Sequence, residues 1–153
     1  MLPQTLLVAT SAFGERLSAQ RVASAIARGL QHAGRSADLC PLDGDEARLP
    51  EKTCHVKQAD ARAVLDALGF DPRMRAARAV IVAVPALHEE TLAGSITFEI
   101  ATRARQGGVP AYAITGENRL DAFDARILDL QEILEARTQR ALSSAGQRLA
   151  ALV

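Results

Sequence analysis

AVIVAVPALHEETLAGSITFEIATRARQGGVPAYAITG, residues Ala79 to Gly116, is the stretch that decides the fold. It opens with a short apolar run, Ala79 to Val84, which is rich in β-branched residues and ends at Pro85, as is typical of a fully buried strand. A polar loop, Ala86 to Gly94, follows. A second apolar run, Val109 to Thr115, has the same character as the first. The pattern therefore predicts two buried strands with one further element between them.

That further element is a predicted helix. Ser95 or Thr97 supplies an N-cap, and Gly107-Gly108 supplies a stop. Apolar residues recur every four positions along one face of the helix: Ile96, Ile100 and Ala104. A strand, a helix and a strand at this spacing form a βαβ unit, which requires parallel strands and a right-handed crossover. Because both strands are apolar on both faces, the sheet must be covered on both sides.

The rest of the chain continues the alternation of strands and helices. In chain order, we expect a strand at Thr5 to Thr10, a helix capped by Ser18, a strand at Ala37 to Leu42, a loop at Asp43 to Cys54, a partly helical segment at Val56 to Leu68, a short turn or helix from Asp71-Pro72, the βαβ unit, a short strand within Leu120 to Leu130, and a helix at Gln131 to Ala151. This order predicts one α/β domain with a three-layer, doubly wound, mostly parallel sheet, Rossmann-like or flavodoxin-like.

Composition narrows the classes of partner. The 18 basic and 18 acidic side chains give zero formal charge, whereas a nucleic-acid binder usually has a basic excess. No apolar run approaches the roughly 20 residues of a membrane span, and the N-terminus lacks a basic leader, so we expect a cytoplasmic protein. For a chain in that compartment, Cys40 and Cys54 are read as free thiols rather than as a disulfide.

Ligands of doubly wound folds bind at the carboxyl edge of the strands, so the loops at that edge hold the candidate site residues. After the first strand, Ser11, Arg16 and Ser18 are candidates for an anion site. This loop faintly resembles a flavodoxin phosphate loop, but it lacks the Gly-Thr pattern. The chain also has no Trp and only one Tyr, so we do not expect a flavin.

The loop after the second predicted strand, Ala37 to Leu42, is acidic. Asp43, Asp45 and Glu46 either bind a divalent cation through their oxygens or form a solvated acidic turn. We favour the turn and expect no resident metal.

The loops after the two strands of the βαβ unit carry ionisable candidates. His88 is a candidate acid/base group or carboxylate ligand, and the alternative is an exposed loop histidine. Glu89 and Glu90 are adjacent, so their side chains diverge, and a solvated loop is the expected state. Arg119 can grip a carboxylate with two parallel hydrogen bonds, against the alternative of an exposed loop residue.

The start of the predicted helix at Ser95 is the best candidate anion site in the chain. Unpaired backbone N–H groups and the helix dipole favour negative charge there. Gly94 permits close approach to the backbone, and Ser95 and Thr97 add hydroxyl donors. His88 lies on the loop that leads to the same edge. The alternative is that Ser95 only caps its helix.

Four pieces of the chain, taken in order, carry a family resemblance: LSAQRVASAIARGL at Leu17 to Leu30, PLDGDEA at Pro41 to Ala47, VLDALGFDPRMRAARAVIV at Val64 to Val82, and TLAGSITFEIATRARQGGVPAYAITG at Thr91 to Gly116. They resemble the bacterial two-domain glycerate kinases. The resemblance implies the Rossmann-like domain of that family. It also implies that the inserted second domain, which forms one wall of the family's substrate cleft, is missing, since only about Leu49 to Val56 stands in its place.

The departures from the family lie in its functional loops. The resemblance implies that Ser11 replaces an acid and that Gly14 and Ser95 replace lysines. A Thr-Gly-Glu-Gly-Arg-Leu-Asp motif is replaced by VAVPALH, which ends at His88. What remains from these loops is Asp43, Gly44, Glu46, Thr91 and Gly94. Phosphoryl transfer needs cations or a metal on the moving phosphoryl group, so these losses predict that kinase turnover was not retained.

Three functions stay open on the sequence. The first is a binding or regulatory module that holds a small anion or a partner subunit. The second is an ATP-dependent kinase acting on glycerate or a related hydroxy acid, which alone would bring ATP and Mg²⁺ as cofactors. The third is a subunit that supplies one wall of a cleft to another chain. We expect a small anionic ligand. We also expect either a homo-oligomer or a partner chain that supplies the missing domain. We expect neither a nucleic acid nor a membrane partner.

Overall fold

The computed structural model describes residues 5–42, 58–91 and 95–153. Its elements in chain order are β1 (Thr5–Thr10), α1 (Ala19–His32), β2 (Ser36–Pro41), α2 (Gln58–Ala67), α3 (Phe70–Arg75), β3 (Ala79–Leu87), a 3-10 turn (Glu89–Thr91), α4 (Ile96–Gln106), β4 (Ala111–Asn118), α5 (Ala122–Leu128), β5 (Ile133–Glu135) and α6 (Gln139–Leu152). The predicted loop at Asp43 to Cys54 lies outside the described residues, as does one of the two cysteines.

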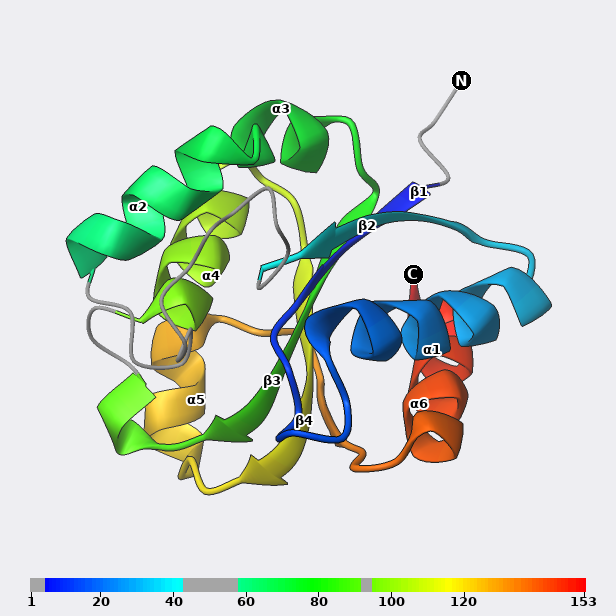
Figure 1. The fold of residues 1–153 in the computed structure, drawn as a ribbon. Coiled ribbons are helices and arrows are strands. Elements are labelled where there is room, and N and C mark those ends of the chain that lie inside the picture. The colour runs from blue at the N-terminus through cyan, green and yellow to red at the C-terminus, as the bar shows by residue number, and fades with distance from the viewer. Residues whose placement is uncertain (1–4, 43–57, 92–94) are drawn as a thin grey trace.

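The five strands form one sheet in the order β2-β1-β3-β4-β5, and every pairing between them is parallel. This is the flavodoxin-like strand order, with β1, β3 and β4 at the centre. Helices α1 and α6 cover one face of the sheet, and α2, α3, α4 and α5 lie on the other (Figure 1). The predicted fold class is therefore confirmed.

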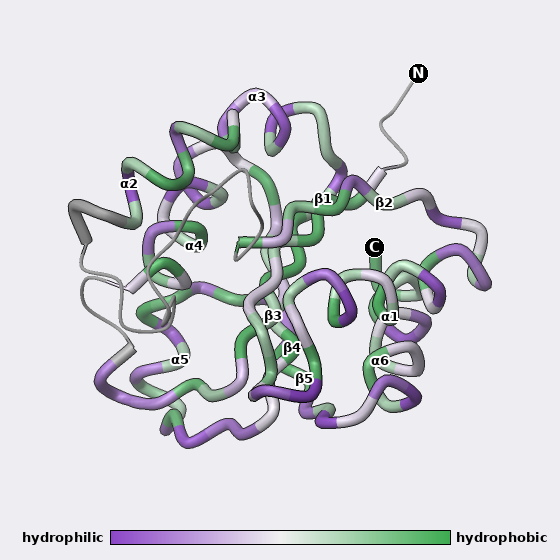
Figure 2. Tube along the Cα trace, viewed as in Figure 1, coloured by the Kyte–Doolittle hydropathy of each residue, from purple (hydrophilic) through white to green (hydrophobic). Residues whose placement is uncertain are grey.

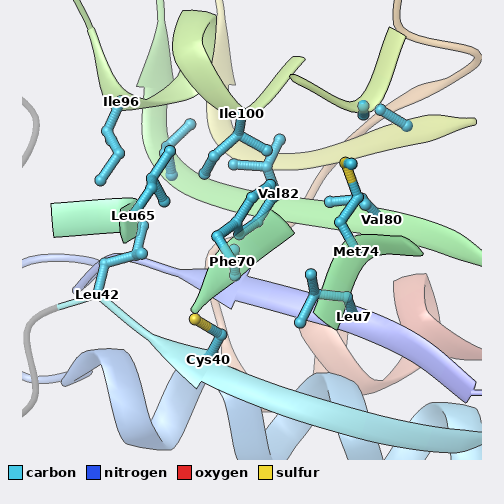
Figure 3. Packing of buried hydrophobic residues seen from close by; sticks show 14 of the residues in the cluster. Leu7, Cys40, Leu42, Leu65, Phe70, Met74, Val80, Val82, Ile96 and Ile100 are labelled. Carbon is cyan, nitrogen blue, oxygen red and sulfur yellow. The ribbon is translucent and has the colours of Figure 1, made fainter. Parts of the chain in front are cut away.

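The two-sided cover explains why the central strands are continuously apolar. Alternate residues of β3 enter different cores: Val80, Val82 and Val84 pack toward α2, α3 and α4, whereas Ala79, Ile81 and Ala83 pack toward α1 and α6. Figure 2 shows the apolar strands inside and the hydrophilic turns of the helices outside. In the first core, Phe70 is fully buried and lies near Val82 and Ile100 (Figure 3).

Two predicted helix starts are confirmed. Ser18 caps α1, since its side chain accepts a hydrogen bond from the backbone N–H of Arg21 at 3.2 Å. Ser95 caps α4 in the same way and accepts from the N–H of Phe98 at 3.0 Å. The predicted inward face of α4 is buried, as Ile96, Ile100 and Ala104 show. Hydroxyl caps of this kind satisfy backbone N–H groups that the first helical turn leaves unpaired.

Strand β3 does not stop at Pro85 as predicted but runs on to Leu87. The ladder between β1 and β3 ends at Thr10 and Ala83, so beyond that point β4 is the one described strand that pairs with β3. Proline is tolerated in a strand where one side needs no N–H donor, so Pro85 does not end the strand. The predicted loop from Ala86 therefore begins with two strand residues.

The largest errors of sequence reasoning lie near the C-terminus. The predicted strand within 120–130 is the helix α5, which Asp121 caps by accepting from the N–H of Asp124 at 2.8 Å. The last strand, β5, is only three residues long and lies inside the segment predicted to be helical. Helix α6 begins after its N-cap, Thr138, rather than at Gln131. A strand this short is too brief for periodicity to reveal it.

Among the residues that the structure describes, no helix is long and apolar enough to cross a membrane.

Candidate functional site

The carboxyl ends of β1, β3 and β4 lie side by side at the lower edge of the sheet in Figure 1. The chain leaves β1 toward β2 on one side and later returns as β3 on the other. The ends of β1 and β3 thus form the switch point at which doubly wound folds bind ligands. The predicted site residues after these strands are therefore brought to one edge, as their positions in the sequence implied.

The loop after β1 places its three predicted anion ligands in different environments. The backbone N–H of Ser11 donates to the carbonyl of Ala83 at 2.9 Å, which ties the loop to β3. The Ser11 side chain is 1% exposed, and its Oγ has no hydrogen-bond partner among the described residues. Arg16 is exposed. The Ser18 hydroxyl is engaged as the cap of α1. Of these three residues, Ser11 is the one whose side-chain polar atom is buried without a partner in the part of the chain that the structure describes.

The loops after β3 and β4 meet directly. The backbone N–H of Arg119 donates to the carbonyl of Leu87 at 2.8 Å, so Arg119 and His88 follow neighbouring strand ends. The Nε of Arg119 also donates to Oε1 of Glu117 at 2.8 Å, but the two side chains are 68% and 43% exposed, so solvent screens this pair. His88 is half-buried. Glu89 and Glu90 are exposed in the 3-10 turn, as the sequence predicted.

The predicted anion site at the start of α4 is described in part. Ser95 and Thr97 are 6% and 3% exposed, and the Ser95 hydroxyl accepts from Phe98 as a cap. Thr91 ends the 3-10 turn. Three candidates, Asp43, Glu46 and Gly94, lie outside the described residues. The Ser95 site therefore stays a prediction.

Sequence reasoning missed a groove of about 340 Å³ at the same edge. We call it the Arg137 groove. Its lining residues come from the loop after β1, from β3 and β4, and from the segment after β5: Phe13, Pro85, Gly116, Glu117 and Arg137. The Nε of Arg137 donates to the carbonyl of Gly116 at 2.6 Å. No signal pointed to Arg137, because its segment was predicted to be helical.

Gly116 sets the spacing of the strands beneath this groove. A Cβ atom at this position would lie 2.6 Å from the carbonyl oxygen of Pro85 in β3. Contacts below 3.0 Å to backbone do not occur without displacement, so any larger residue would push β3 and β4 apart. The groove floor therefore requires glycine at this point.

A second charged cluster lies away from the edge and joins α2, α3 and α4. Arg103 donates to Glu99 at 3.1 Å, to Asp66 at 2.9 Å and to Asp71 at 3.1 Å. Burial by itself lowers the pKa of the Arg103 guanidinium, but the hydrogen bond to Glu99 and the pairs with Asp66 and Asp71 outweigh it, so the pKa is raised. The raised pKa keeps Arg103 charged, which fits a structural role.

Within residues 5–42, 58–91 and 95–153, no group of three or more His, Cys, Asp or Glu side chains is placed to hold a metal ion. The predicted acidic loop with Asp43, Asp45 and Glu46 is outside these ranges. The described part of the edge therefore offers serine, histidine and arginine side chains and exposed carboxylates.

Comparisons with known proteins give one family and one fold. A sequence model of the glycerate kinase family matches residues 54–152. A search of curated proteins found no match. Among solved structures, the chain is similar to the flavodiiron protein from Giardia intestinalis, with 12% identity and a TM-score of 0.54 over 98% of this chain. The chain spans only 36% of that protein.

Two further structures show the same likeness. The diflavin flavoprotein A3 from Nostoc sp. is 14% identical with a TM-score of 0.51, and the match covers 99% of this chain and 94% of that one. A flavone reductase is 13% identical with a TM-score of 0.51, over 96% of this chain and 62% of that one. At this identity, the likeness concerns the fold alone.

Proposed function

The chain belongs to the glycerate kinase family, and from that premise we propose that it is a small-anion-binding or regulatory module of the family without kinase turnover. The ligand site is the carboxyl edge of the sheet, where the loops after β1, β3 and β4 meet. The family model matches only from residue 54 onward, so it does not include β1 or the loop after it. For that loop, the proposal relies on the sequence resemblance and on the geometry of the site.

The observation that carries the proposal is the role of Ser95. The resemblance places a lysine of the family at this position, and here the residue is the N-cap of α4, with its hydroxyl accepting from Phe98 at 3.0 Å. A lysine carries only donors and cannot accept this bond. Position 95 thus contributes helix stability in place of a positive charge, and phosphoryl transfer depends on such charges.

Gly14 supports the same conclusion. The resemblance places another family lysine here, and the backbone has φ +75°, a left-handed conformation that favours glycine. The turn is closed by the N–H of Phe13 donating to the carbonyl of Leu17 at 2.8 Å. A lysine at position 14 would strain this turn. The loop after β1 is therefore built without the cation that the family carries.

Binding of a small anion is supported by the groups that remain. Ser11 Oγ is buried without a partner in the described part of the chain, and the arginines at this edge supply positive charge. The sequence resemblance implies that the inserted second domain, one wall of the family's cleft, is missing, so we propose that a partner chain takes its place. The module would then report the bound anion to that partner.

Thermal unfolding in the presence of inorganic phosphate, glycerate or MgATP tests the binding part of the proposal. We expect phosphate or glycerate at millimolar concentration to raise the melting temperature, because a ligand that binds only the folded state stabilises it. MgATP should raise the melting temperature no more than inorganic phosphate does. Stabilisation by MgATP and glycerate together, much larger than by either alone, would instead support the kinase alternative.

A further inference from the structure

We propose that the Arg137 groove binds a small monocarboxylate with a short apolar body. The inference rests on the proposed anion-binding function and specifies its ligand. The groove lies across the carboxyl ends of the strands and holds about 340 Å³, near the lower end of the usual volume of small-molecule sites. It is distinct from the predicted anion site at Ser95.

Arg137 supplies the recognition of the carboxylate. Its Nε donates to the carbonyl of Gly116 at 2.6 Å, and this is its only hydrogen bond among the described residues. The bond fixes the plane of the guanidinium at the groove while its two terminal nitrogens stay available. A planar carboxylate accepts two parallel hydrogen bonds from such a fork. Because one end of the guanidinium is already held, less side-chain freedom is lost when the ligand binds.

The other walls of the groove favour an apolar ligand body. Phe13 and Pro85 are half-buried and line the groove, and Gly116 adds bare backbone. Phe13 is held in place by the bond between its N–H and the Leu17 carbonyl. A ligand body of a few carbons, or one ring, would remove this apolar surface from water.

The charges around the groove favour one negative charge over two. Glu117 lines the groove and is paired with Arg119 through the 2.8 Å contact between Oε1 and Nε. Glu135 lies on β5, two residues before Arg137, and accepts from the N–H of Asn118 at 3.2 Å. These two carboxylates offset the charges of Arg119 and Arg137, so these four side chains have no excess positive charge to attract a dianion, and the single fork of Arg137 matches one carboxylate.

The test is an amide NMR titration of the whole chain with benzoate, and separately with inorganic phosphate. We expect benzoate to shift the signals of Phe13, Gly116 and Glu117. Arg137→Gln should weaken benzoate binding about tenfold or more, because a charge-assisted bond is lost. Arg137→Lys should also weaken it, since lysine keeps the charge but not the fork. The matched control, Arg140→Gln, changes an exposed arginine three residues further on and should leave the affinity unchanged.

Melting temperatures of the variants show that each is folded. Benzoate binding that is unaffected by both Arg137 substitutions would overturn the inference, as would phosphate binding more tightly than benzoate in the groove. If phosphate shifts only Ser95 to Thr97 and the Arg137 substitutions have no effect, the inference fails while the proposed anion-binding function stands. If the chain turns over ATP and benzoate still binds through Arg137, the proposed function fails while this inference stands.

Discussion

Two neighbouring hydroxyls at the end of β1 illustrate how the same chemistry has opposite consequences at the scale of a residue. Thr10 Oγ1 donates to the carbonyl of Ala19 at 2.7 Å and is fully buried. Ser11 Oγ is equally buried but has no partner in the described part of the chain. A buried polar group costs free energy unless it is hydrogen-bonded. Thr10 therefore fastens the loop to α1, whereas the Ser11 hydroxyl forms no such bond within the described residues, and we propose that a ligand satisfies it.

We expect Ser11→Ala to leave the free energy of unfolding unchanged or to raise it by up to about 1 kcal/mol, because no bond is lost. Thr10→Val, the matched control, should lower it by about 1 kcal/mol through loss of the bond to Ala19. Urea unfolding of both variants measures the difference. A clear destabilisation by Ser11→Ala would mean that its hydroxyl is satisfied in the folded protein.

Sequence reasoning found some residues of the candidate edge and missed others for identifiable reasons. The caps Ser18 and Ser95 were predicted because a hydroxyl before an apolar helical pattern is a local signal. Arg137 was missed because its role depends on a contact with Gly116, which is far away in the chain. Local patterns do not record which distant carbonyl a guanidinium meets.

At the scale of elements, the joint between α2, α3 and α4 depends on Arg103. Its guanidinium bonds to Glu99 on its own helix, to Asp66 on α2 and to Asp71 on α3. The side chains of Arg103 and Glu99 are only 12% and 9% exposed, and Arg103 is the closer of two cations at Glu99, since the exposed Arg62 of α2 lies 3.6 Å from the same carboxylate oxygen. A buried carboxylate without its partner is strongly destabilising.

We expect Arg103→Ala to lower the free energy of unfolding by about 2–3 kcal/mol, below the full buried-pair value because Asp66 and Asp71 are partly exposed. Arg105→Ala, on the exposed side of the same helix, should change it by less than about 0.5 kcal/mol. Denaturant titration measures both. Equal effects of the two substitutions would show that the cluster contributes only surface charge.

The raised pKa of Arg103 also fixes how this contribution depends on pH. A cation with a raised pKa in the folded state stabilises the fold at every pH below its unfolded pKa, and it loses that contribution only as pH rises through the folded value. For arginine this window is strongly alkaline. The difference in unfolding free energy between wild type and Arg103→Ala should therefore not fall between pH 7 and pH 9. A steep fall in that range would contradict the assignment.

Helices α1 and α6 cross with almost no space between their backbones. A Cβ atom on Gly29 would lie 1.9 Å from the carbonyl oxygen of Ser143, and one on Gly146 would lie 2.5 Å from the carbonyl oxygen of Ile26. Both neighbours are backbone atoms, which cannot rotate away. The two glycines therefore permit the contact that closes this side of the sheet.

We expect Gly29→Ala to lower the melting temperature and to reduce the free energy of unfolding by about 1–3 kcal/mol, despite the better helix propensity of alanine. Ser144→Ala, at an exposed position of α6, should be neutral or slightly stabilising. Differential scanning calorimetry compares the two. A stabilised Gly29→Ala would mean that the helices separate without cost.

The element boundaries show where local signals were sufficient. The βαβ unit around α4 was predicted because its strands and helix each carry a full period of apolar residues. The segment from Leu120 to Thr138 was misread because β5 has three residues and α5 buries only Leu128. Strand β5 exists because it pairs with β4, from Ala113 with Ile133 to Thr115 with Glu135. This pairing is a tertiary contact, so the local sequence pattern does not reveal the strand.

At the scale of the whole molecule, the parallel sheet brings the loops after β1, β3, β4 and β5 to one edge, and this edge is where a doubly wound fold is expected to bind its ligand. The fold class followed from the alternation of strands and helices. The groove did not, because it is formed by four segments that only the completed sheet brings together. Family membership and fold thus do not determine the chemistry of the site, which depends on the residues of the loops.

The most direct test of the central claim is a coupled ADP-release assay with the whole chain, MgATP and glycerate. We expect no ADP release above the rate without glycerate, because Gly14 and Ser95 stand where the family resemblance places lysines. Asp43→Ala is the control, since Asp43 is retained from the family's functional loops, and it should leave the background rate unchanged. Glycerate-dependent ADP release that Asp43→Ala abolishes would contradict the account and restore the kinase function.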